Sequence, residues 1–343
     1  MITKRKGQNL TGMNTFRMNV SCDLYIEYDS VADLIDIDFE TLPKPVLHIG
    51  GGSNLLFSGN FRGTVLHSAI KFIYELPEDD PLHTGPDEVL VSVGAGVKFD
   101  DFCAWAAENG LWGAENLSHI PGEAGAAAVQ NIGAYGVEAK DIIAGVTCFD
   151  IEKKEKTAFK VDECRYGYRD SIFKSEGFKS RYIVTGVLFR LSRKALPKIE
   201  YGALKSVFAD GVPENPMQVR EAVIKIRDSK LPSPDRTGSA GSFFKNPIVS
   251  PADFARICEG YESVPHYLLP GGFIKVPAAW LIEQCGLKGQ ANGGAAVYEK
   301  QPLVIVNRSG EASPEDVIGL ERRIVETVKE KFGVELHPEV EHI

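Results

Sequence analysis

The 343-residue chain is long enough for two domains, or three, each with its own hydrophobic core. With 43% hydrophobic and 25% charged residues, it has the composition of an ordinary globular protein. Its formal net charge of −9 argues against nucleic acid or an anionic membrane as a partner, because both favour a basic surface. Any phosphate site must therefore be a local cluster of basic side chains.

The cysteines and the N-terminal segment indicate a cytosolic protein. The six cysteines show no CxxC pair and no zinc-type spacing with histidine, so we interpret them as reduced, buried thiols and expect no metal site. The segment MITKRKGQNLTG is basic but lacks the apolar region of a signal peptide, and no stretch approaches 18 apolar residues. We expect a protein that is neither exported nor membrane-spanning.

Residues up to about 191 predict a mixed α+β domain. A short helix is expected in VADLIDIDFE and a longer one in FDDFCAWAAEN, where Phe99, Phe102, Cys103 and Ala106 share one face that would cover a sheet. Alternating patterns predict strands in GTVLHSAI, KFIYEL, EVLVSVGAGV, IIAGVTCFD, KTAFKV and RYIVTGVLFRL.

The segment VLHIGGGSNLLF reads as a strand, a glycine turn and a second strand. Successive backbone N–H groups at Gly50, Gly51 and Gly52 can form an anion-binding nest, and Ser53 and Asn54 add side-chain donors. On its own, such a turn is more often a simple hairpin. It lacks the GxGxxG spacing and the following helix of a Rossmann unit, so a nucleotide bound here would not be held by that fold.

The run from His119 to Asp141 is rich in glycine, alanine and turn formers. Its small side chains would let the main chain approach a flat ligand closely, and Gln130 and Asn131 offer paired donors and acceptors for a ring edge. The competing interpretation is a tightly packed helix crossing with glycine and alanine at the contact. The run by itself favours neither.

The second half of the chain predicts a smaller α+β domain after a linker from Pro197 to Pro216. Strands are expected in NGGAAVYEKQPLVIVN. Lysines 230, 245, 275 and 288 would form a local positive patch, which favours a phosphorylated ligand. PADFARICEG is an amphipathic stretch. The predicted helices are 216–230, PAAWLIEQCG with Pro277 as first helical residue and Gly286 as C-cap, and a helix capped by Ser313 and Asp316 that ends at Gly333.

Three further residues carry side chains that could take part in binding or catalysis. Arg169 can bind a carboxylate through its guanidinium fork, although a surface ion pair is the ordinary interpretation of an isolated arginine. Ser242 follows two glycines, but neither a GxSxG elbow nor histidine and aspartate partners are present, so a serine hydrolase is rejected. Glu339 would lie on the polar face of a strand, VELHPEVEHI, where a solvated acidic edge is the ordinary interpretation.

Motifs in order along nearly the whole chain resemble one known family. They are GGGSNLLF (50–57), IPG and QNIGAYG (120–136), YGYRDSIFK (166–174), AGSFFKNP (240–247), AAWLIEQCGLKG (278–289) and HPEV (337–340). Together they resemble the UDP-N-acetylenolpyruvoylglucosamine reductase family, and YGAL at Tyr201 is similar to its longer, loop-containing type. Glu123 departs from the neutral residue expected there. A flavin pyrophosphate would repel an anion at this position, so its side chain must point away or the local contact must differ.

The resemblance implies an α+β protein with an FAD-binding domain of the vanillyl-alcohol-oxidase/PCMH-like type, rather than Rossmann, and a smaller α+β substrate-binding domain. The implied boundaries are 1–192 for the FAD-binding region, split near 65, 193–215 for a linker and substrate loop, 216–333 for the substrate-binding domain and 334–343 for a C-terminal strand. The implied activity is cytoplasmic and belongs to peptidoglycan precursor synthesis. Noncovalent FAD and NADPH would reduce the enolpyruvyl group of a UDP-sugar to give UDP-N-acetylmuramate.

The resemblance also implies the site residues. Arg169 would stabilise an enolate, Ser242 would deliver a proton and Glu339 would assist. The implied flavin-binding residues are Gly50, Gly51, Gly52, Ser53, Asn54, Pro121, Gly122, Gln130, Asn131, Gly133, Ala134, Tyr135 and Gly136. The implied substrate-binding residues are Tyr168, Tyr201 on a mobile loop, Lys230, Asn246, Tyr267, Lys288 and Gln301.

The expected partner is a small nucleotide sugar, with no nucleic acid or membrane partner and a monomeric state. Two other functions fit part of the sequence. One is a different FAD-dependent oxidase on the same architecture, such as an alcohol oxidase, against which AGSFFKNP and HPEV argue. The other is a flavin-free nucleotide-sugar binding protein in which Arg169 and the lysines only hold phosphates.

Overall fold

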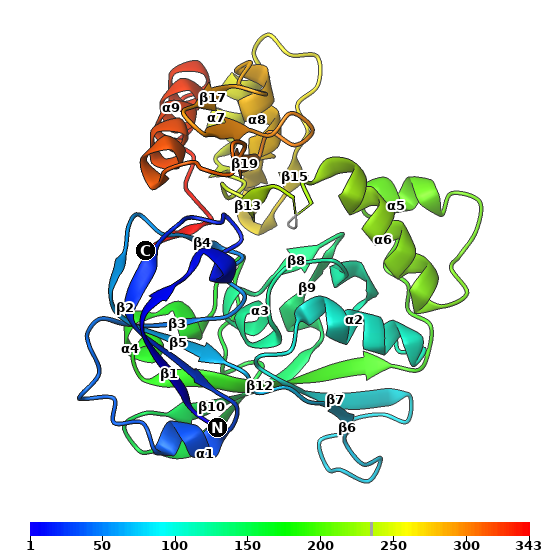
Figure 1. Ribbon diagram of the computed structural model, residues 1–343. Coiled ribbons are helices and arrows are strands. Elements are labelled where there is room, and N and C mark those ends of the chain that lie inside the picture. Colours follow the sequence, from blue (N-terminus) through cyan, green and yellow to red (C-terminus); the bar gives the residue numbers. More distant parts are fainter. Residues whose placement is uncertain (234–235) are drawn as a thin grey trace. The chain divides into compact units, whose positions relative to one another are not determined.

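The computed structural model describes residues 1–233 and 236–343, and Figure 1 shows the course of the chain. Its contacts divide the chain into two compact units, each assembled from segments far apart in the sequence. Unit 1 comprises Met1–Gln8, Cys22–Gly51 and Arg62–Ser229, and unit 2 comprises Asn9–Ser21, Gly52–Phe61 and Lys230–Ile343.

Unit 1 combines sheets and helices, as the sequence predicts. One sheet has the strand order β1-β2-β5-β3 and another the order β11-β10-β12-β7-β6. The strands are β1 (Thr3–Asn9), β2 (Ser21–Tyr28), β3 (Val46–Ile49), β5 (Phe61–Ser68), β6 (Ile73–Glu75), β7 (Glu88–Gly94), β10 (Ile143–Asp150), β11 (Glu155–Lys160) and β12 (Tyr182–Ser192), with a short pair, β8 (Gly133–Ala134) and β9 (Val137–Glu138). The helices are α1 (Val31–Ile35), α2 (Phe99–Glu108), α3 (Ala124–Gln130), α4 (Glu176–Lys179), α5 (Gly202–Val207) and α6 (Pro216–Lys230).

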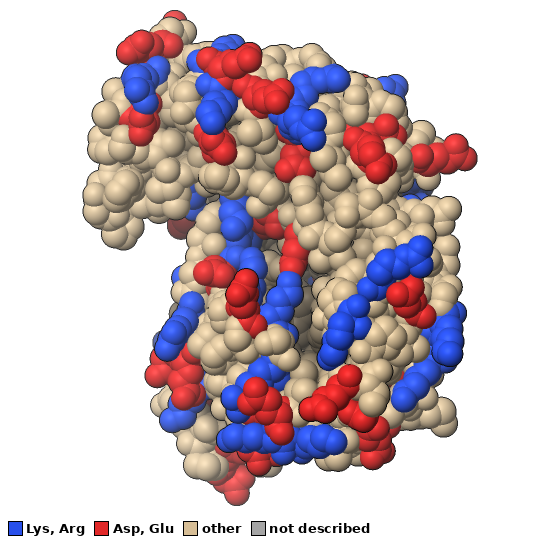
Figure 2. Space-filling model, turned by 90° about the vertical axis from the view of Figure 1, so that its left-hand side faces the viewer, with Lys and Arg blue, Asp and Glu red and all other residues tan. Residues whose placement is uncertain are grey.

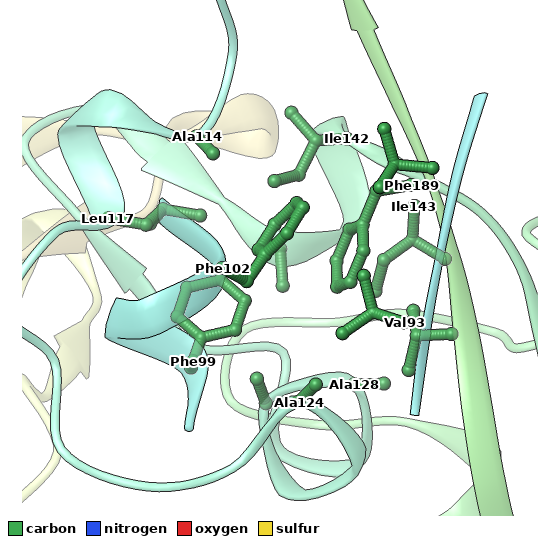
Figure 3. Close-up of a cluster of buried hydrophobic side chains, with 14 of the residues drawn as sticks. Val93, Phe99, Phe102, Ala114, Leu117, Ala124, Ala128, Ile142, Ile143 and Phe189 are labelled. Atoms are coloured by element: carbon green, nitrogen blue, oxygen red, sulfur yellow. The ribbon is translucent and has the colours of Figure 1, made fainter. Parts of the chain in front are cut away.

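One aromatic cluster of unit 1 lies where α2 meets β12. Phe99 and Phe102 of α2 pack on Phe189 of β12, and the ring centroids of Phe102 and Phe189 are 4.3 Å apart. The predicted helix and its apolar face are confirmed. Ala124 and Ala128 of α3 are buried in the same cluster (Figure 3). The small side chains of Ala124 and Ala128 therefore let α3 pack closely within this cluster.

The predicted linker contains a helix that packs within unit 1. Leu204 of α5 is buried with Trp112 and with Val219 and Val223 of α6. Because this apolar contact fixes α6 to unit 1, the compact units divide between Ser229 and Lys230, whereas the sequence-based domains divide at residue 216.

Unit 2 contains shorter strands and three helices among its described residues. Its sheets have the orders β13-β19-β18-β17 and β14-β16-β15, and β20 pairs with β4. The strands are β4 (Leu55–Leu56), β13 (Gly238–Ser242), β14 (Ile248–Val249), β15 (Tyr267–Leu268), β16 (Ile274–Lys275), β17 (Ala291–Asn292), β18 (Ala295–Val297), β19 (Val304–Asn307) and β20 (Glu341–His342). The helices are α7 (Pro251–Cys258), α8 (Ala278–Gln284) and α9 (Pro314–Phe332).

The boundaries of two predicted elements in unit 2 are corrected. Helix α8 begins at Ala278 with Pro277 as N-cap and ends with Cys285 as C-cap, each one residue from the prediction. The predicted C-terminal strand over 334–343 is wrong in extent, because only Glu341–His342 forms a strand. Burial still alternates before it. The proline at position 338 has no N–H to donate to a ladder and makes only an isolated bridge with Phe244.

The structure can be compared with the predictions about thiols, membrane spans and metal sites. All six thiols are unpaired, but the expectation that all are buried is corrected, because Cys258 and Cys285 are partly exposed. Within 1–233 and 236–343, no helix is long and apolar enough to cross a membrane, and no cluster of histidine, cysteine and acidic side chains could hold a metal ion.

The capping box of α9 yields a stability prediction. Ser313 Oγ accepts a hydrogen bond from Asp316 N at 3.1 Å, and Asp316 Oδ2 accepts one from Ser313 N at 3.0 Å. Ser313→Ala is expected to lower the free energy of unfolding by about 1 kcal/mol, because Asp316 N loses its side-chain acceptor. Urea denaturation measures this. Ser263→Ala, at an exposed position, is the control and should change stability by less than about 0.5 kcal/mol.

Candidate functional site

The glycine turn after β3 is not a hairpin. Strand β3 pairs in parallel with β5, and β4 pairs in parallel with β20, so the strands on either side of the turn belong to different sheets. A Cβ on Gly51 would lie 3.4 Å from Gly122 Cα, and one on Gly50 would lie 3.0 Å from Ala126 Cβ. The predicted nest and the predicted IPG loop therefore meet at Gly51 and Gly122, where a Cβ on Gly51 would make an ordinary van der Waals contact, whereas one on Gly50 would be crowded by Ala126.

The far end of this turn is tied to the C-terminal segment within unit 2. Asn54 Nδ2 donates to the carbonyl of Glu339 at 3.0 Å, and Glu341 N donates to the carbonyl of Asn54 at 2.9 Å. Gly52 O accepts from Thr15 N at 3.1 Å. Asn54, a predicted flavin-binding residue, thereby positions the backbone of Glu339, a predicted catalytic residue.

The C-terminal end of α3 holds a buried amide. Asn131 is in the left-handed region at φ 44° and is fully buried. Its Nδ2 donates to Glu138 Oε2 at 3.1 Å and to Gly167 O at 2.7 Å, and its Oδ1 accepts from Lys140 N at 3.0 Å. The Asn131 amide thereby fixes the loops that carry its neighbours. Its predicted hydrogen bond to a ligand ring stays a prediction.

Arg169 lies against the predicted flavin-binding segment. Its Nη1 donates to Asn131 O at 3.3 Å and its Nη2 to Gly133 O at 3.0 Å, and its guanidinium carbon is 5.4 Å from the centre of the Tyr168 ring. The two carbonyls orient the guanidinium. Arg169 is therefore held by the QNIGAYG segment, from which it is separated by more than 30 residues.

Tyr201 contacts the same segment. It precedes α5, and a Cβ on Gly136 would lie 3.3 Å from Tyr201 Cβ; the positive φ of 82° at Gly136 also disfavours a side chain there. Unit 1 therefore brings together Arg169, Tyr201 and the short β8-β9 pair. The remaining predicted residues of this segment lie on these elements: Gln130 ends α3, Gly133 and Ala134 form β8, and Tyr135 and Gly136 connect β8 to β9.

Unit 2 brings Ser242 and Glu339 onto neighbouring segments. Ser242 ends β13, opposite Val304 of β19. Beyond it, Phe243 O accepts from Glu339 N at 2.8 Å, and Lys245 N donates to His337 O at 2.9 Å. The HPEV motif thus runs along AGSFFKNP. Arg169 belongs to unit 1, so convergence of all three catalytic residues stays a prediction.

The predicted substrate-binding residues of unit 2 already interact within the chain. Asn246 Oδ1 accepts from Ala278 N at the start of α8 at 2.9 Å, and Lys275 Nζ lies 5.5 Å from the centre of the Tyr267 ring. Lys288 forms an ion pair with Glu283. The carbonyl of Gln301 accepts from Val304 N at 3.0 Å in the turn before β19, and Lys230 ends α6.

These contacts limit the predicted lysine patch. Lysines 230, 245, 275 and 288 are therefore not equivalent, because Lys288 is paired with the carboxylate of Glu283. On the face shown in Figure 2, acidic and basic side chains lie next to one another rather than in separate fields.

The structure also adds a cluster that sequence reasoning missed. Glu123, the departure from the family pattern, does not cap α3 with its side chain. Its Oε1 lies 2.9 Å from His67 Nε2, and His67 Nδ1 lies 3.1 Å from Glu27 Oε2. The signal in the sequence is weak, since His67 is one polar residue in the apolar strand GTVLHSAI. The Glu123 side chain thus pairs with His67, and how it stands toward a bound flavin stays a prediction.

Comparison with known proteins places these features in a family. Residues 23–153 match the FAD binding domain, and residues 233–343 match the UDP-N-acetylenolpyruvoylglucosamine reductase C-terminal domain. The reductase of Bacteroides fragilis strain YCH46 is 46% identical over 98% of both chains, and that of Porphyromonas gingivalis strain W83 is 44% identical over 99% of both.

A solved structure agrees with these sequence matches. The crystal structure of the Thermus caldophilus UDP-N-acetylenolpyruvylglucosamine reductase aligns with a TM-score of 0.67 and 25% identity, covering 100% of this chain and 98% of that one. The predicted α+β fold with an FAD-binding domain, rather than a Rossmann fold, is confirmed. The chain therefore belongs to the UDP-N-acetylenolpyruvoylglucosamine reductase family.

Proposed function

We propose that this protein uses NADPH and noncovalent FAD to reduce the enolpyruvyl group of UDP-N-acetylglucosamine enolpyruvate, giving UDP-N-acetylmuramate for peptidoglycan synthesis. The full-length similarity to reductases of this name carries the proposal. The match of residues 233–343 to the C-terminal domain of these reductases supports it further, because a different oxidase on an FAD-binding domain would not need that domain. We further propose a cytoplasmic location and a monomeric state.

The residues of the glycine turn suit FAD. Gly50 and Gly51 leave main chain rather than side chain where the turn meets Gly122, and successive backbone N–H groups can hold a pyrophosphate. When bound, FAD would take a hydride from NADPH and supply it to the outer vinyl carbon of the substrate. The residues of unit 1 that would hold it are Gly50 and Gly51 of the turn, the IPG loop and the QNIGAYG segment.

Arg169 is proposed to stabilise the negative charge that spreads onto the substrate carboxylate. A fork held in place by two carbonyls needs no reorganisation as the charge develops, which is the condition for strong electrostatic stabilisation. Glu339 is proposed to assist this polarisation as an acid or hydrogen-bond partner. Its backbone is fixed by Phe243 and Asn54.

Ser242 is proposed to donate the proton to the substrate carbon next to the carboxylate. A hydroxyl is a weak acid, but the carbanion it meets is strongly basic, so proton transfer is reasonable in the transition state. The proposed substrate contacts are Tyr168, Tyr201, Lys230, Asn246, Tyr267, Lys288 and Gln301. Of these, Tyr201 is proposed to move with its loop to cover the substrate.

The purified protein tests the proposal directly. We expect a yellow protein with a flavin spectrum that bleaches on anaerobic addition of NADPH and recovers when the enolpyruvyl sugar nucleotide is added. Rapid oxygen consumption with a small alcohol would favour an oxidase instead. A colourless protein that takes up no FAD would favour a flavin-free binding protein.

A further inference from the structure

A buried carboxylate lies beside the glycine turn. Glu123 is 9% exposed, and its Oε2 is 3.3 Å from the position that a Cβ on Gly50 would take. Its other oxygen, Oε1, faces His67 Nε2 at 2.9 Å. The carboxylate therefore stands between His67 and the turn proposed to bind the pyrophosphate of FAD, where a negative charge is unfavourable.

His67 has an acidic partner on each ring nitrogen. Its Nδ1 lies 3.1 Å from Glu27 Oε2, which also accepts a hydrogen bond from the Tyr25 hydroxyl at 2.9 Å. A doubly protonated imidazole donates to both carboxylates, whereas a neutral ring can donate to only one. Burial disfavours the charge on His67, but the hydrogen bonds and charges of Glu123 and Glu27 outweigh burial and raise its pKa above the ordinary value.

We propose that His67 is a positioning residue for FAD, whose proton offsets the charge of Glu123 and lets an anionic pyrophosphate bind at the neighbouring glycine turn. The inference rests on the proposed function for its cofactor. With His67 protonated, the three groups Glu27, His67 and Glu123 carry one negative charge; without that proton they carry two. The additional charge repels the pyrophosphate.

The proposal predicts that FAD affinity depends on pH. Other titratable or charged groups around His67 are Tyr25 of β2, His48 of β3 and Arg5 of β1, which acts on Glu27 and Tyr25. Burial raises the pKa of Tyr25, so this residue stays neutral at neutral pH. Because the pKa of His67 is raised, affinity should be highest near pH 6 and should fall as pH rises through the pKa of His67.

Titration of FAD-stripped protein with FAD, followed by quenching of flavin fluorescence, tests the proposal. At pH 6, His67→Gln should raise the Kd for FAD on the order of tenfold, the size expected for one uncompensated charge nearby. Glu123→Gln should bind at least as tightly as the wild type, and the double variant should recover the affinity that His67→Gln loses. Asp23→Asn is the matched control, because it removes a carboxylate of strand β2 that is exposed and pairs with Arg62 rather than with His67; its Kd should stay near the wild-type value.

The pH series separates an electrostatic role from a merely structural one. Between pH 6 and pH 9 the Kd of the wild type should rise, and that of Glu123→Gln should rise much less. A double variant that binds as weakly as His67→Gln, or equal pH dependence in the wild type and Glu123→Gln, would overturn the inference while leaving the proposed function intact. If the wild type binds no FAD at any pH, both fail. Glu123→Gln removes only a charge, so it keeps the test decisive even if His67→Gln does not fold.

Discussion

Replacing Ser242 by alanine is expected to slow reduction of the enolpyruvyl sugar nucleotide by about 100-fold or more while leaving reduction of FAD by NADPH at the wild-type rate. The change removes only the hydroxyl proposed as proton donor, and general acid catalysis has this magnitude. The hydride transfer from NADPH needs no proton from that position. Anaerobic stopped-flow absorbance measures the two half-reactions separately.

The matched control is Ser239→Ala on the same strand. Ser239 lies opposite Val306 of β19, as Ser242 lies opposite Val304, with an irregularity of the ladder between them. Both half-reactions of this variant should match the wild type. Equal losses in the two half-reactions of Ser242→Ala would refute its assignment as the proton donor, because they would indicate damage to the FAD site or to the fold.

Replacing Arg169 by lysine is expected to lower kcat/KM for the sugar nucleotide by about 100- to 1,000-fold, the usual effect of removing one preorganised donor from a developing anion. Lysine keeps the positive charge. It loses the planar fork that binds a carboxylate in bidentate fashion and that Asn131 O and Gly133 O now orient. Steady-state kinetics with saturating NADPH measures the effect.

FAD content must be measured on the same samples, because Arg169 contacts the segment proposed to hold the flavin. Arg165→Lys is the control, since Arg165 is exposed and precedes the same motif; its kcat/KM should be unchanged. If Arg169→Lys retains full FAD and near-normal kcat/KM, then charge alone suffices and the proposed bidentate contact is wrong.

Elements governed by local sequence were the predictable ones. The 3.6-residue period in FDDFCAWAAEN predicts α2 and its buried face, and the Ser313–Asp316 box predicts the start of α9. Both signals act within a few turns of one helix. By contrast, the partner of β4 is β20 at the other end of the chain, which no local pattern specifies. The strand predicted over 334–343 is too long for the same reason: alternating apolar and polar residues indicate which side chains are buried, but not which strand they pair with.

Side-chain roles within the candidate site were less predictable than its motifs. An exposed amide and a buried amide look alike in a sequence, so Asn131 was expected at a ligand although three protein groups use it. The pairing of Glu123 with His67 joins the N-cap of α3 to a strand more than 50 residues earlier. Only packing could show that the unexpected acid has an imidazole partner.

By itself the sequence determined the family, the α+β class and the residues able to do chemistry, because motif identity and short-range periodicity are properties of neighbouring residues. The tertiary structure alone decided which of those residues meet. Ser242 and Glu339 become neighbours through the pairing of Phe243 with the HPEV segment, and Arg169 is aligned by the carbonyls of Asn131 and Gly133. Contacts between distant segments depend on the summed burial and hydrogen bonding of a whole unit, so they are absent from any short stretch of sequence.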